Sequence, residues 1–202
     1  MKPVPNYFTI VFEDPLSEAV IERLCALCKE RIVIHRRMHA RGCGYIRSRI
    51  RELNAAAMHN PYLILLDSDD HHCALTLLES LMPPPVRSKR CLFRIAVHEI
   101  EAWLVADAKG IAAFLAVSTA LVPKNPESVV DPKAAIVALA SRSRKRQIRE
   151  GLAPARGTTA KVGPEYNLLL IDFVLNKWDI VTASRHSESL HRAIRAVKSF
   201  KY

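Results

Sequence analysis

The first hundred residues alternate between short apolar runs and stretches with helical spacing, and this alternation restricts the fold more than any other feature. Apolar runs of strand length occur at 7–12, 32–34, 62–66 and 91–97. Between the first two runs, Leu16, Val20 and Leu24 recur at helical spacing. The run at 62–66 is apolar throughout, which is typical of a central strand covered on both faces. The pattern predicts βαβ units, hence an α/β fold with a mostly parallel sheet flanked by helices.

The character of the chain changes after Asp107. The segments that follow are more helical than strand-like, and they lie at 109–117, 133–149, 165–177 and 187–199. The sequence therefore predicts an α/β core over 1–107 and an α-rich C-terminal extension over 108–202 that packs on the core. The joint at 151–164 has several small residues and few large apolar ones, so we expect it to be the most mobile loop.

Composition bounds the class of protein. Half of the 202 residues are hydrophobic, which is enough for a sizeable core in one compact domain with an extension. No apolar run approaches the ~20 residues that a membrane-spanning helix needs, and the N-terminal stretch lacks the features of a signal peptide. The five cysteines are odd in number and scattered in apolar segments, which favours reduced thiols in a cytoplasmic protein. Cys25 and Cys28 are expected in the core, because no second ligand pair at zinc spacing accompanies them.

The net charge of +10 is concentrated in two arginine-rich segments, 31–51 and 141–161. Arginine suits phosphate, and basic stripes are typical of proteins that bind DNA or RNA. Aromatic residues make up only 6% of the chain, so contact with the phosphate backbone is expected rather than base stacking. Solvated helix faces remain the alternative explanation. The candidate nucleic-acid-binding residues are Arg36, Arg37, Arg142, Arg144, Lys145, Arg146 and Arg149.

Acidic residues follow three of the apolar runs, at the points where an α/β protein binds ligands. Clustered carboxylates repel one another unless a cation neutralises them, and hard oxygen ligands suit Mg²⁺ or Mn²⁺. If the strands are parallel neighbours, Glu13, Asp67 and Asp69 converge at one edge of the sheet. Acids that form turns or cap helices are the alternative. The candidate metal ligands are Glu13, Asp67, Asp69, Asp70 and Glu101.

A strand that ends in Glu, followed later by an apolar strand that ends in Asp-x-Asp, resembles the signature of Toprim domains. FEDPLSEAVI (12–21) is similar to the opening of Toprim nucleases of the overcoming-lysogenization-defect type. There Glu13 matches the metal-associated glutamate and LLDSDD (65–70) the Asp-x-Asp, although Asp14 replaces the usual glycine. Longer blocks resemble an uncharacterised Toprim-like bacterial family with a domain of unknown function, and they lie at 93–107, 122–133 and 141–174.

The resemblance implies a Toprim-like fold and a Mg²⁺- or Mn²⁺-dependent nuclease. The residues that would carry catalysis are Glu13, Asp67 and Asp69, with Glu13 alternatively a general acid or base and Glu101 assisting. It also implies a role in phage defence. The alternative is a non-catalytic module that binds nucleic acid or a partner and keeps a vestigial acidic site. No GxxxxGK[ST] loop is present, so any ATPase would be a partner chain, and a homodimer stays open.

Overall fold

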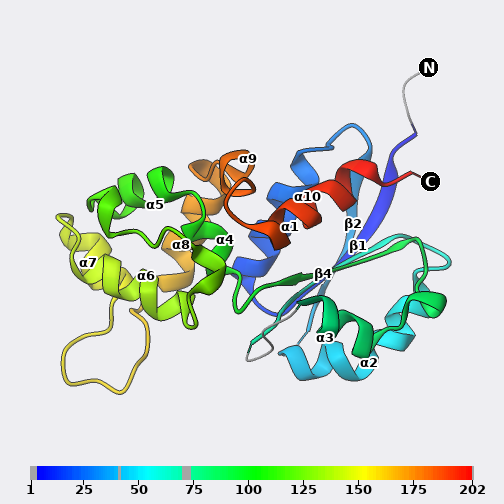
Figure 1. The fold of residues 1–202 in the computed structure, drawn as a ribbon, viewed down its shortest axis with the longest axis horizontal. Helices are drawn as coiled ribbons and strands as arrows, with labels where there is room; N and C mark the ends of the chain where they lie inside the picture. Colours follow the sequence, from blue (N-terminus) through cyan, green and yellow to red (C-terminus); the bar gives the residue numbers. More distant parts are fainter. Residues whose placement is uncertain (1–3, 41, 70–73, 202) are drawn as a thin grey trace.

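The sheet has four parallel strands in the order β2-β1-β3-β4 (Figure 1). The computed structural model describes residues 4–40, 42–69 and 74–201. The strands are β1 (Asn6–Phe12), β2 (Ile32–His39), β3 (Tyr62–Asp67) and β4 (Cys91–Ala96). The apolar run at 62–66 forms β3, which lies between β1 and β4 and is buried along its length. The predicted α/β class with a parallel sheet is confirmed.

Helices cover both faces of this sheet. On one face lie α1 (Pro15–Ala26) and α10 (Glu188–Ser199), and on the other α2 (Cys43–Ala56) and α3 (Ala74–Leu81) (Figure 1). Successive strand side chains point to opposite faces. In β3, Leu63 and Leu65 therefore join the core under α1, while Ile64 and Leu66 join the core under α2.

The residues after β4 are helical, as predicted. The helices between β4 and α10 are α4 (Glu101–Val105), α5 (Ala108–Leu115), α6 (Pro132–Ser141), α7 (Arg146–Leu152), α8 (Tyr166–Asn176) and α9 (Ile180–Ala183). Two short 3₁₀ turns, η2 (Thr119–Leu121) and η3 (Pro126–Ser128), lie between α5 and α6, and another, η1 (Pro84–Val86), precedes β4. Helix α8 packs on α1, and α10 returns to β4. The ring centroids of Phe8 and Phe200 lie 4.8 Å apart, with the rings edge to face. Both residues belong to one hydrophobic core that the sheet shares with the helical part. No helix in the described ranges has the length and apolarity to cross a bilayer.

Two local predictions were wrong. The expected helix at 133–149 is interrupted between α6 and α7, where the buried Ser143 hydroxyl accepts a hydrogen bond from the Lys145 amide at 3.0 Å. Such side-chain bonds compete with helical ones. Strand β2 extends to His39, beyond the expected 32–34. It is an edge strand, where polar and charged side chains face water without cost to the core.

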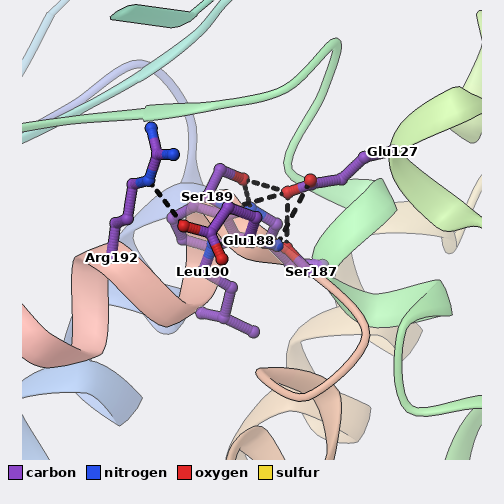
Figure 2. Close-up of polar contacts among 7 residues, drawn as sticks. Glu127, Ser187, Glu188, Ser189, Leu190 and Arg192 are labelled. Atoms are coloured by element: carbon purple, nitrogen blue, oxygen red, sulfur yellow. Dashed lines mark hydrogen bonds and ion pairs between the residues drawn. The ribbon is translucent and has the colours of Figure 1, made fainter.

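A hydrogen-bonded network fixes the start of α10 (Figure 2). The Glu127 carboxylate accepts hydrogen bonds from the hydroxyls of Ser187 and Ser189, at 2.7 and 2.5 Å, and from the amides of Glu188 and Ser189. The Ser189 hydroxyl in turn accepts from the indole of the fully buried Trp103, at 2.6 Å. The carboxylate thus satisfies orphan amides of a helix start and connects η3, α4 and α10.

Glu127→Gln should lower the free energy of unfolding by about 1–3 kcal/mol, because a neutral amide cannot accept all four hydrogen bonds and is a weaker acceptor. Urea denaturation followed by circular dichroism measures this change. Glu188→Gln is the matched control, since this neighbouring carboxylate is exposed and pairs with Arg192 on the same helix (Figure 2). Equal effects of the two substitutions would contradict a special role for Glu127.

Candidate active site at the carboxyl ends of the strands

Carboxylates from three strand ends lie at one edge of the sheet. Glu13 follows β1, Asp67 ends β3, and Glu99 and Glu101 follow β4. Burial raises the pKa of Asp67 well above its usual value, and the negative charges of Glu101, Glu13 and Glu99 raise it further. The acids expected to converge from separate strands therefore act on one another electrostatically.

Glu13 has a buried carboxylate oxygen, Oε1, without a hydrogen-bond partner among the described residues. Burial raises the pKa of Glu13 to about 7, while a hydrogen bond from the Asp67 main chain opposes the shift and the charge of Asp69 adds to it. An unpartnered buried carboxylate oxygen is costly in a folded protein, which makes this position a candidate for ligand contact.

The turns after β3 and β4 are held in an unusual backbone conformation. Asp69 and His98 both have positive φ angles, 49° and 58°, which are uncommon for residues other than glycine. The Asp69 amide donates to the His98 carbonyl at 2.9 Å, and the His98 amide donates to the hydroxyl of buried Ser68 at 2.8 Å. These bonds continue the pairing of the two strands into their loops. They fix Asp67 and Asp69 relative to Glu99 and Glu101, as strained backbone often does at functional sites.

Lys133, at the start of α6, supplies a positive charge to the acidic group. Its Nζ lies 3.4 Å from Glu99 Oε1 and 3.6 Å from Glu101 Oε1, and its amide donates to Glu99 Oε2 at 3.0 Å. Burial by itself would lower the pKa of Lys133, but the carboxylates of Glu101, Glu99 and Asp67 raise it above its usual value. The ammonium is therefore charged at neutral pH. Sequence reasoning missed this residue.

Tyr166, the first residue of α8, connects the helical part to the same group. Its hydroxyl donates to Glu101 Oε1 at 3.0 Å, and both side chains are buried. Glu101 is only 2% exposed, and burial raises its pKa although the charge of Lys133 acts in the opposite direction. Glu101 was predicted as a site residue, but Tyr166 was not. The site is consequently built from strand ends, from α6 and from α8.

The other acids near the strand ends have different surroundings. Asp69 is exposed and forms an ion pair with Arg47 of α2 at 3.0 Å. Asp14 caps α1 by accepting from the Ser17 amide at 2.7 Å, which is the structural role left open for acids at strand ends. Asp70, a predicted metal ligand, lies outside the described residues.

The donor chemistry fits a hard cation, but the described side chains do not form a preformed metal site. Carboxylates are the ligands that Mg²⁺ and Mn²⁺ favour, and Glu13 offers an unpartnered oxygen. Within 4–40, 42–69 and 74–201, no three Asp, Glu, His or Cys side chains are arranged to hold a metal ion. Positive charge comes instead from Lys133 and Arg47.

The predicted nucleic-acid-binding residues fall into two groups. On β2, Arg36 is exposed, whereas Arg37 forms ion pairs with Glu18 and Glu22 of α1 at 2.8 and 2.6 Å. In the second group, Arg149 is partly buried and donates to the Ser143 carbonyl at 2.6 Å. The other members are exposed between α6 and α7 or on α7, and they are Arg142, Arg144, Lys145 and Arg146.

Comparisons with protein-family models, with curated proteins and with solved structures give no match for this chain.

Proposed function

We propose that this chain is a Toprim-like, Mg²⁺- or Mn²⁺-dependent nuclease that cleaves phosphodiester bonds in DNA or RNA. The observation that supports it best is the group of interacting carboxylates at the carboxyl ends of parallel strands, where α/β proteins bind ligands. The exposed cations between α6 and α7 support it independently, since they suit a polyanionic substrate. A cytoplasmic location, a role in phage defence, and a homodimer or an ATPase partner belong to the same proposal.

Each acidic residue has a role in this proposal. Glu13, Asp67 and Asp69 would hold the cation, with Asp70 and Glu101 as further ligands. When bound, the cation would stabilise charge on the scissile phosphate and activate a water molecule. Lys133 keeps a positive charge beside Glu99 and Glu101, which limits repulsion between the carboxylates and favours an approaching phosphate. Tyr166 holds the Glu101 carboxylate in place through its hydroxyl.

A second candidate function follows from the ion pairs. Lys133 and Arg47 already neutralise part of the acidic group, so it can persist without a cation. The chain would then be a non-catalytic module that binds nucleic acid or a partner through its basic residues.

The test uses the purified chain with fluorescently labelled DNA and RNA, in Mg²⁺ or Mn²⁺ and in EDTA. The nuclease proposal expects shortened products on a denaturing gel in the presence of either cation and none in EDTA. Salt-sensitive binding without cleavage, measured by fluorescence anisotropy on the same samples, would support the non-catalytic module. If the chain neither binds nor cleaves either nucleic acid, the nuclease and the nucleic-acid-binding module are both overturned.

A further inference from the structure

The segment at 153–162, between α7 and α8, stands away from the rest of the helical part (Figure 1, gold). Every residue from Ala155 to Lys161 is exposed. At the far end, the Thr158 amide and hydroxyl both bond to the Ala155 carbonyl. Gly157 there has a φ angle of 81°, so Arg156 and Gly157 occupy the centre of a tight turn. We call this segment the arm.

The root of the arm is held firmly although the arm itself is exposed. The Gly163 amide donates to the Leu152 carbonyl and the Glu165 amide to the Gly151 carbonyl, both at 2.9 Å. The backbones approach so closely that a Cβ atom on Gly163 would lie 2.4 Å from the Gly151 oxygen. Only glycine fits there. The arm is therefore a projecting loop whose two ends are held together by hydrogen bonds, as in an Ω-loop.

One residue, Tyr166, connects the root of the arm to the acidic group. The Tyr166 amide bonds to the Gly163 carbonyl at the root of the arm, and the Tyr166 hydroxyl bonds to Glu101. Going out and back over seven residues, the arm reaches roughly 10 Å from its root. A phosphate chain that runs from the acidic group past the root of the arm would therefore come within reach of the arm.

The chemistry of the arm selects a polyanion. It carries Arg156 and Lys161 and no acid, and its other residues from 155 to 160 are Ala, Gly and Thr. It lacks the large apolar side chains that anchor protein interfaces and the aromatic rings that stack on bases. Neither the Arg156 nor the Lys161 side chain forms a hydrogen bond or ion pair within the part of the chain that the structure describes. Small residues allow the backbone to come close to a phosphate chain.

We propose that the 153–162 arm contacts the phosphate backbone of a nucleic acid that extends from the acidic group, through Arg156 and Lys161. This inference rests on the proposed function for its partner, because it adds a second set of phosphate contacts to that of the α7 region. The contacts are with phosphate alone, so they apply to duplex and single-stranded substrates of any sequence.

The test is the double variant Arg156→Ala/Lys161→Ala, with binding to a DNA duplex and to a single strand measured by anisotropy in EDTA. We expect binding about ten-fold weaker at low salt. Between about 50 and 200 mM salt, the slope of log K against log salt should become less steep by about 2 for the duplex, one for each lost contact. For the single strand the change should be slightly smaller.

The matched control is Lys29→Ala/Lys198→Ala, which removes the same charge from two other exposed positions. It should bind like the parent chain. If the arm variant also binds like the parent, this inference is overturned while the proposed function stands. If the parent chain binds neither nucleic acid, the proposed function fails as well. Thermal unfolding of both variants should match that of the parent, because the substituted side chains are exposed.

Discussion

If the proposed nuclease function is right, Asp67→Asn should reduce metal-dependent cleavage at least about 100-fold, because it removes the proposed charged ligand from the acidic group with little change of side-chain shape. The same substitution should raise stability in EDTA at neutral pH. Burial and the neighbouring carboxylates raise the pKa of Asp67 in the folded protein, so ionising it costs stability as the pH rises above the ordinary value of 3.8. Asparagine carries no such charge. The gain over the parent should therefore be absent near pH 4 and grow toward neutral pH.

The two readouts separate a functional carboxylate from a structural one. If the Asp67 carboxylate had a structural role, its substitution would lower activity and stability together. The expected variant is instead more stable than the parent chain and nearly inactive. Asp172→Asn is the matched control, because it removes one negative charge from the exposed side of α8, where Asp172 pairs with Lys177. It should keep cleavage at the parental rate. Cleavage at that rate by Asp67→Asn would show that the catalytic site lies elsewhere or that a contaminant is responsible.

The architecture of the sheet was predictable because its signal is local. The apolar run at 62–66 has the length and composition of a doubly covered strand, and it forms β3 between β1 and β4. The positions of Glu13, Asp67 and Glu101 at strand ends followed from the same pattern, since parallel strands end at one edge. The break between α6 and α7 was not predictable from periodicity. It depends on hydrogen bonds of the buried Ser143.

The role of Lys133 as the positive charge of the acidic group was not predictable, because the residues that it contacts are distant in the sequence. Lys133 lies 34 residues from Glu99, and only the packing of α6 beside α4 brings them together. One signal was available. A lysine in the first turn of a helix meets the positive end of the helix dipole, which is unfavourable unless carboxylates compensate. Tyr166 gave no comparable signal, since an aromatic residue at the start of an apolar helix is expected to be part of the hydrophobic core.

Lys133→Met should be the most destabilising substitution of a charged residue in this site. It keeps most of the aliphatic side chain but leaves the buried Glu101 carboxylate without its cation. Removing one partner of a buried pair costs about 3–5 kcal/mol; because the Lys133 side chain is 38% exposed, we expect about 2–3 kcal/mol at neutral pH. Urea denaturation measures the loss. It should shrink at acidic pH, where Glu101 takes up a proton because burial raises its pKa.

A second substitution decides whether the uncompensated charge is the cause. Glu101→Gln keeps an oxygen that can accept from Tyr166 but carries no charge, so adding it to Lys133→Met should restore most of the lost stability. Alone, Glu101→Gln should cost little, because Lys133 retains its contact with Glu99. If the two effects simply add, the loss in Lys133→Met comes from packing rather than charge. In that case the carboxylates do not need Lys133 as their counter-ion, and the ion pairs no longer favour a non-catalytic module over a cation-binding nuclease.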